Sequence, residues 1–288
     1  MAQEPTTGLF QWFKIGTSAA NAGLGLITGG DMSSNPGTKR ILGVGGTEVR
    51  VGGMLTLGAS VTVAVGGDNQ EYIAGGFRAS YPRGALTKYK LAGGTDAWGR
   101  AYADAVVLDG SLSYKQDSQL SATLNYGAVS IAEAAGSTMP AMAEDILMDW
   151  QVAVEIEGVD YMVKSLDLKW NNNVAFKKAG KAKVAGTMRT PDYMTVGIED
   201  LSVDLVLAKP IPTSVDSVLY DCLADDLTII LTATSCNGDA LELTLDNLMQ
   251  QGDNRHSLVD PNTDAEWPYS FMGSSYAGSM TWEWTPGA

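Results

Sequence analysis

The chain has little of what catalysis and covalent cross-linking usually require, since its 288 residues include 1 histidine and 2 cysteines. Two cysteines do not make a disulfide framework, so we expect Cys222 and Cys236 to be reduced, partly buried thiols. His256 has no second histidine with which to share a metal and no nucleophile motif beside it, so we expect a surface side chain. The sequence therefore predicts a protein that is not an enzyme and has no catalytic residue, no metal site and no cofactor.

Long apolar runs are also missing from the sequence. No window of about 20 uninterrupted apolar residues exists, so we expect no transmembrane helix and no membrane partner. The first residues lack a basic segment followed by an apolar one, which indicates no secretory signal and argues against an outer-membrane barrel. The glycine-rich run 43–53 lacks the Gly-Lys-Ser/Thr ending of a phosphate loop and precedes no helical pattern, so it predicts strands and turns.

Acidic residues are abundant, and the formal net charge is −14, which disfavours nucleic-acid binding through an ordinary basic face. Residues 197–288 hold 15 acids against the two bases Lys209 and Arg255. Bases gather instead in two earlier stretches, at Arg83, Lys88, Lys90 and Arg100 and at Lys177, Lys178, Lys181 and Lys183. Patches of opposite charge at different places suit head-to-tail contact between copies, because a heterologous interface joins unlike surfaces.

An internal repeat organises the rest of the sequence, because residues 72–114 recur in diverged form as residues 161–205. The landmarks that coincide are Tyr72 with Tyr161, Phe77 with Leu166, Tyr81 with Trp170, and Asp109–Tyr114 with Asp200–Leu205. Each copy predicts a strand, a long basic loop and a second strand. We therefore expect an N-terminal arm over residues 1–40, with a short strand at 9–15 followed by an extended loop, a first β unit over 41–135 and a second over 136–288.

Alternating patterns place the strands that follow each basic loop. Asp109, Ser111 and Ser113 share one face of the first strand, and Ser202 and Asp204 share one face of the second, with apolar residues on the opposite faces. Residues 105–131 predict an antiparallel pair, and residues 227–245 predict a hairpin with Asn-Gly at its tip. Two short helices are expected, over residues 139–150 with Trp150 in the core and over residues 214–223.

Together these features resemble the tail tube proteins of long-tailed bacteriophages (siphoviruses). The resemblance rests on the β-rich pattern, the strand pairs around basic loops at 79–100 and 169–189, the helix at 139–150 and the N-terminal arm. In that family, the sheets of several subunits join edge to edge into a ring whose inner wall is a β-barrel. Rings stack into the tube through which DNA leaves the capsid. Members with two fused tube domains form trimeric rings, and the duplication makes this chain similar to those.

The resemblance implies a mainly β fold of two tandem antiparallel sandwich or barrel units with one or two flanking helices. It implies a structural virion protein, assembled in the host cytoplasm and located in the virion tail. Expected partners are further copies, a tape measure protein and tail-terminator or tail-tip proteins, with DNA passing unbound through the lumen. The polar faces with Asp109, Ser111, Ser113, Ser202 and Asp204 would line the lumen, and the two basic stretches would contact the next ring.

Two alternatives remain open at this stage. An acidic β-sandwich on a virus or cell surface, such as a head-decoration module, would have the same composition without forming filaments. A carboxylate-dependent glycosidase would also fit, because its paired acids meet only in the folded chain.

Overall fold

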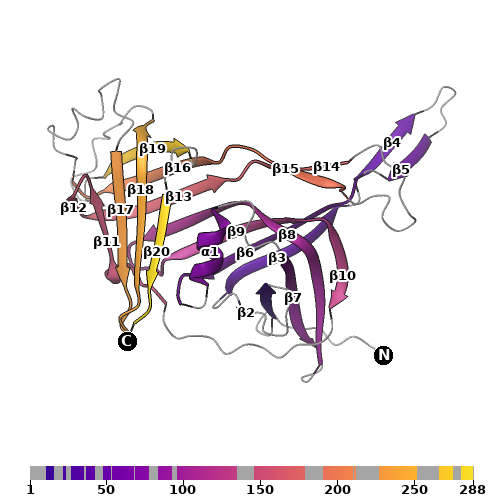
Figure 1. Ribbon diagram of the computed structural model, residues 1–288, viewed down its shortest axis with the longest axis horizontal. Coiled ribbons are helices and arrows are strands. Elements are labelled where there is room, and N and C mark those ends of the chain that lie inside the picture. The colour runs from indigo at the N-terminus through magenta and orange to yellow at the C-terminus, as the bar shows by residue number, and fades with distance from the viewer. Residues whose placement is uncertain are drawn as a thin grey trace.

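The computed structural model describes residues 11–15, 22–23, 27–35, 37–42, 48–52, 54–67, 69–77, 84–92, 96–134, 146–178, 191–209, 211, 227–251, 266–274 and 280–287. These residues are mainly strands, and they form one large antiparallel sheet of 16 strands, two separate two-stranded ribbons and a single short α-helix. The described strands do not close into a barrel within one chain. Figure 1 shows that the sheet bends so that two of its parts run at a steep angle to each other.

The central part of the sheet, called sheet 1 here, contains seven strands in the spatial order β3, β6, β9, β8, β13, β16 and β19. Their bounds are Ile27–Asn35 (β3), Thr56–Ala64 (β6), Ser121–Ala128 (β9), Asp96–Lys115 (β8), Val163–Asn171 (β13), Asp200–Leu207 (β16) and Trp267–Ser274 (β19). The prediction of an antiparallel pair over residues 105–131 is confirmed by β8 and β9. The predicted strand around residue 204 is confirmed by β16.

The second part, called sheet 2, contains five strands in the order β12, β11, β17, β18 and β20. Their bounds are Val159–Tyr161 (β12), Val152–Ile156 (β11), Leu227–Thr234 (β17), Ala240–Gln250 (β18) and Met280–Thr285 (β20). The predicted hairpin over residues 227–245 is confirmed by β17 and β18. Sheet 2 joins sheet 1 at a corner near Asn247, which has a positive φ of 54°. Beyond it, Met249 and Gln250 pair with β19.

The remaining strands lie beside or beyond these two sheets. The N-terminal half of β8 pairs with β7 (Gly84–Ala92) and β10 (Ser130–Ala134), and β7 continues through β1 (Gln11–Ile15) to β2 (Ala22–Gly23). Two ribbons stand apart, β4 (Thr38–Leu42) with β5 (Glu48–Gly52), and β14 (Val174–Lys177) with β15 (Tyr193–Val196). Figure 1 shows both ribbons extending away from the sheets at the same end of the molecule.

The core lies between sheet 1 and sheet 2, because each contributes one apolar face. Burial alternates along β16, where Leu201, Val203, Leu205 and Leu207 are buried, and along β17, where Leu227, Ile229, Leu231 and Ala233 are buried. Period-2 alternation of this kind is typical of a strand with one covered face. The two faces meet at Phe77, whose ring centroid lies 4.6 Å from Trp170 of sheet 1 and 5.6 Å from Trp282 of sheet 2. Trp282 and Trp284 are partly buried and pack against the core.

The only α-helix of the described chain, α1 (Gln70–Gly76), occupies a segment for which the repeat predicts a strand, so that prediction is wrong. Ile73 and Phe77 are buried at helical spacing, which ties the segment to the core. The Gly76 carbonyl at the helix end accepts hydrogen bonds from Trp170 Nε1 and Asn172 Nδ2, both at 2.9 Å. Two donors satisfy a carbonyl that a helix end leaves without an intrahelical partner.

The repeat holds only in its second half. Residues 72–76 are helical and Phe77 caps the helix, whereas Tyr161 ends β12 and the matched residues 163–166 begin β13, so the landmarks there join unlike structures. Asp109–Tyr114 and Asp200–Leu205 are both strands, and they flank β13 on opposite sides. Asp109 and Asp200 both lie opposite Asn171 in register. The similarity therefore reflects two strands that share one neighbour and the same alternation of polar and apolar residues.

Several other expectations are corrected by the structure. In the predicted helix over residues 139–150, residues 146–148 are extended and Asp149–Gln151 form a 3₁₀ turn, with Trp150 68% exposed and not in the core. The predicted short strand at 9–15 is confirmed by β1, but the extended loop expected in the rest of the arm contains β2 and β3. Cys236 is exposed and not partly buried. Residues 139–145, Cys222, His256 and the helix expected at 214–223 lie outside the described residues.

The predicted basic loops are largely strands. Lys88 and Lys90 lie in β7 and Arg100 lies in β8, where Lys88 and Arg100 are opposite each other in register. In the second stretch, Lys177 ends β14 and Lys178 follows it, both exposed. Arg83, Lys181 and Lys183 lie outside the described residues. The sequence pattern was misleading here because strands can carry as many lysines as loops do.

Replacing Gly110 with alanine should destabilise the protein. A Cβ atom at this position of β8 would overlap the indole ring of Trp170, which packs between Gly110 and Phe77. We expect a loss of about 1–3 kcal/mol in the free energy of unfolding, measured by urea denaturation. The matched control is Gly29→Ala, because a Cβ there would meet Thr62 at an ordinary 3.8 Å. Equal stability of the two variants would contradict the packing.

The buried Tyr126 should make the stability of the protein depend on pH in the alkaline range. Burial raises the pKa of its phenol above the ordinary value of 10.0, and its hydroxyl has no hydrogen-bond partner among the described residues. The stability that the neutral phenol contributes is complete below pH 10 and is lost as pH rises toward the folded-state pKa. Tyr126→Phe should therefore match or exceed the wild type at pH 7 and lose less stability above pH 10. Tyr193→Phe, at a half-exposed tyrosine, is the control in the same denaturation series.

Candidate functional site

The face of sheet 1 that points away from the core is polar over its whole width. A row of directly opposed residues crosses six strands: Asp31, Ser60, Asn125, Asp109, Asn171 and Asp200. A second row, one pleat further along, consists of Thr62, Thr123, Ser111, Lys169 and Ser202. A third contains Ser121, Ser113, Asp167, Asp204 and Ser270. We call this surface the polar face.

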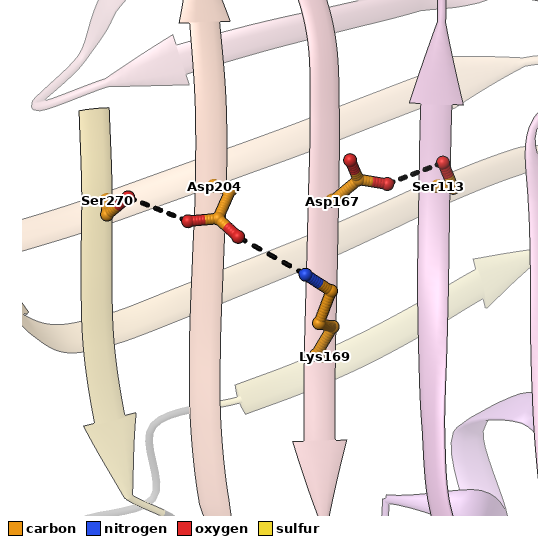
Figure 2. Close-up of polar contacts among 5 residues, drawn as sticks. All are labelled: Ser113, Asp167, Lys169, Asp204 and Ser270. Carbon is orange, nitrogen blue, oxygen red and sulfur yellow. Dashed lines mark hydrogen bonds and ion pairs between the residues drawn. The ribbon is translucent and has the colours of Figure 1, made fainter. Parts of the chain in front are cut away.

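Side-chain hydrogen bonds connect neighbouring strands across the polar face (Figure 2). Ser113 Oγ donates to Asp167 Oδ1 at 2.7 Å, and Ser270 Oγ donates to Asp204 Oδ1 at 2.7 Å. Lys169 Nζ reaches the other oxygen of Asp204 at 3.4 Å. Both members of this ion pair are about half exposed, so it adds little to stability. These contacts fix the directions of the side chains across four adjacent strands.

Further along the same strands, each of the two aspartates opposite Asn171 has an asparagine donor. Asn125 Nδ2 donates to Asp109 at 2.5 Å, and Asn173 Nδ2 donates to Asp200 at 2.8 Å. The surface is hollowed there, with a volume of about 490 Å³ bordered by Asp109, Ser111, Lys169, Asp200, Ser202 and Gln251. Asp109 and Asp200 stand two strands apart, which is about 10 Å between backbones. The hollow offers hydrogen-bonding groups and carboxylates to a polar solute.

The polar face carries more acid than base. Its described aspartates are Asp31, Asp109, Asp167, Asp200 and Asp204, and its described bases are Lys115 and Lys169. Such a surface is well hydrated and repels anions at short range, with salt reducing the effect beyond about 10 Å. The described residues contain no group of three His, Cys, Asp or Glu side chains placed to hold a metal ion. Nor does any helix in the described ranges have the length and apolar content to cross a membrane.

The structure brings together all five residues predicted for the lumen. Asp109, Ser111, Ser113, Ser202 and Asp204 lie on the polar face, on both sides of β13. The residues that sequence reasoning missed are Asp31, Asn125, Asp167, Lys169 and Asn171. Four of them could have been found, since Asn125 alternates with buried residues in β9, and Asp167, Lys169 and Asn171 alternate with Leu168 and Trp170 in β13. Assigning 169–189 to a loop hid the end of β13.

The described residues among the predicted ring contacts lie elsewhere, in β7, in the N-terminal half of β8 and at the end of β14. The structure does not gather Lys88, Lys90 and Arg100 with Lys177 and Lys178 into one element. No protein-family model and no curated protein matches the chain, so these comparisons identify no relative.

The hydrogen bonds of the polar face can be tested by a pair of serine substitutions. Ser113→Ala removes a donor to Asp167 in a partly buried pair, and we expect a loss of about 1–2 kcal/mol in the free energy of unfolding. Ser111→Ala is the matched control, because Ser111 lies on the same strand and face without a side-chain hydrogen bond to another described residue. Urea denaturation at pH 7 measures both. A loss in both variants, or in neither, would contradict the assigned bond.

Proposed function

We propose that this protein is a structural subunit that assembles into rings and stacked rings, forming the tail tube of a long-tailed bacteriophage. The observation that carries the proposal is the polar face, an open sheet surface of seven strands that is net acidic and backed by a closed core. A globular protein buries one face of such a sheet and exposes the other to water. The polar face is broad, and its central strands carry no large apolar side chains there. Such a surface suits the wall of an aqueous channel.

The edges of sheet 1 support assembly with further copies. In the described residues, β3 pairs only with β6, and β19 pairs with β16 along its length but with β18 only at Phe271 and Met272. An exposed edge strand offers unpaired backbone groups to another chain, and closure into a barrel removes such edges. Six antiparallel steps separate β3 from β19, so the two edges run in the same direction. Copies related by rotation would therefore join through a parallel β19–β3 pair.

The width of such a barrel favours three copies. Three copies supply 21 strands, since sheet 1 has seven. With strands about 4.8 Å apart and tilted by about 40°, the backbone circumference is about 130 Å and the diameter about 40 Å. Side chains reduce this to a bore that still admits a DNA duplex. Six copies would give about twice the diameter, which is wider than a conduit for one duplex requires.

In this proposal Asp109, Ser111, Ser113, Ser202 and Asp204 line the bore together with Asp167 and Asp200. Carboxylates there repel DNA phosphates, whereas a basic lining would bind DNA through counterion release. The sandwich of sheet 1 and sheet 2 would form one wall segment of the tube. Tape measure, tail-terminator and tail-tip proteins would be the partners, and the virion tail the location.

Electron microscopy of the purified protein at high concentration tests the proposal. Hollow tubes or rings with three copies, seen end-on, are the expected result. Six copies per ring would keep the conduit and contradict the width argument. Solid filaments without a bore, or an isolated sandwich at every concentration, would contradict the conduit and favour a surface or head-decoration module.

The charge of the lining can be tested separately. Ser111→Lys with Ser202→Lys should leave tube formation intact but make the tubes retain double-stranded DNA at low salt and release it at high salt. Thr244→Lys with Thr281→Lys adds the same charge on the outer face of sheet 2, where these residues are opposite each other in register. This control should not retain DNA inside tubes. Equal DNA retention by both variants in a co-sedimentation assay would argue against the polar face as the lining.

A further inference from the structure

The turn that joins β17 to β18, called the tip here (residues 235–239), holds the only asparagine of the sequence that a glycine follows, Asn237 before Gly238. Both residues are exposed, and Figure 1 shows the C-terminus beside this turn. An Asn-Gly pair is chemically reactive, because a glycine has no side chain to shield its backbone nitrogen from the preceding side-chain amide. The tip is therefore a place where the chain can modify itself.

The reaction available at such a pair is deamidation. The Gly238 nitrogen attacks Cγ of Asn237 and forms a new C–N bond, the bond from Cγ to the side-chain nitrogen breaks, and ammonia leaves with the Gly238 proton. The resulting succinimide ring takes up a water molecule, which opens it to aspartate or to isoaspartate. No oxidant or reductant takes part. Either product carries an additional negative charge at neutral pH, and isoaspartate also inserts a methylene group into the backbone.

Hydrogen bonds within the tip hold the attacking nitrogen in place. The Gly238 N–H donates to the Ser235 carbonyl at 3.1 Å, and Gly238 has a φ of 89°. This is the pattern of a type I turn closed by a glycine in the left-handed region. The buried Ser235 Oγ accepts hydrogen bonds from the N–H groups of Asn237 at 3.3 Å and Asp239 at 3.0 Å. The attack on Cγ therefore requires the Gly238 N–H to leave Ser235 and the turn to rotate.

The segment that follows β20 packs against the tip from outside. The Gly287 N–H donates to Asp239 Oδ1 at 2.7 Å. A Cβ atom at Gly287 would overlap the Asn237 carbonyl oxygen and crowd the Asp239 nitrogen, so only a glycine lets the two backbones lie in contact. The Asn237 carbonyl belongs to the same peptide unit as the Gly238 nitrogen. Gly287 thus packs on the peptide unit that has to move in the reaction.

We propose that Asn237 is a deamidation site whose reaction is held back by the packed Gly287, and that the modification makes the opening of the tip permanent. Deamidation occurs in molecules whose Gly287 has left the tip and whose turn has opened. Isoaspartate at residue 237 displaces the carbonyl on which Gly287 packs, so Gly287 no longer fits. A transient local opening is thereby converted into a lasting change. The tip lies in sheet 2, away from the polar face and from β3 and β19, so this inference does not depend on the proposed function.

Peptide mapping by mass spectrometry, after incubation of the full chain at neutral pH, tests the proposal. The folded protein should form aspartate and isoaspartate at residue 237 at least about tenfold more slowly than the same chain unfolded in urea. Gly287→Ala displaces Gly287 from the tip and should raise the rate in the folded protein at least about fivefold, because a hydrogen bond and a close contact are lost. Equal rates in the folded and unfolded chains, or an unchanged rate in Gly287→Ala, would overturn the proposal.

Two control variants separate opening of the tip from unfolding of the whole protein. Thr285→Ala changes an exposed side chain at the end of β20, shortly before Gly287, and should deamidate as the wild type does. Gly110→Ala lowers the global stability through its contact with Trp170 in sheet 1 and should also leave the rate unchanged, because the tip opens locally. An increase in Gly110→Ala as large as that in Gly287→Ala would assign the reaction to global unfolding and overturn the proposal.

Amide hydrogen exchange tests the consequence of the modification for Gly287. In the unmodified protein its amide is protected by the hydrogen bond to Asp239. In protein enriched in the isoaspartate form by chromatography, this amide should exchange at least about fivefold faster. Asn237→Asp is the matched control, because it adds the charge without lengthening the backbone and should keep the amide protected. Equal exchange in the modified and unmodified proteins, or equally fast exchange in Asn237→Asp, would overturn the proposed link between the longer backbone and the loss of Gly287 from the tip.

Discussion

The alternation of polar and apolar side chains along β8, β13 and β16 is the constraint on which the rest of the structure depends. Because successive side chains in a strand point to opposite faces of the sheet, these strands present one apolar face and one polar face. The apolar face must be buried, and sheet 2 and α1 bury it around Phe77, Trp170 and Trp282. Gly110 leaves room for the Trp170 ring at the centre of this contact. The opposite face of these strands stays exposed to water and is the polar face.

The corner between the sheets follows from the same requirement. A flat sheet of 16 strands would expose its apolar side, so the chain folds the sheet over at β18. The positive φ at Asn247 and the register shift between Leu227 and Ile229 turn the strand there. A register shift of this kind places an extra residue in one strand of a pair, which bends that strand and increases its twist. Asn247 is one of the few residue types that adopt this conformation readily.

Local sequence patterns predicted the strands and hairpins whose pairing partners are close in sequence, and they predicted little of the remaining structure. The β8–β9 pair and the β17–β18 hairpin follow from residues close in sequence, and so does the polar face with Asp109 and Asp204. The helix α1 was missed because its helical spacing matters only once Trp170 and Asn172, about 95 residues away, hold its last carbonyl. The strand β3 was missed because its Gly, Ser and Asn residues favour turns, and only pairing with β6 makes it a strand. Contacts with residues far away in the sequence therefore determine the structure of both segments.

The number of strands in sheet 1 constrains how the proposed ring would close. Seven strands in strict antiparallel order leave edges β3 and β19 that point the same way, so a β19–β3 joint makes neighbouring copies point the same way too. A two-fold axis would instead bring like edges together and reverse every second copy. In the proposed ring closed by β19–β3 joints, every copy would therefore present the same ends of its strands to the same rim, so the two rims of the ring would be different surfaces.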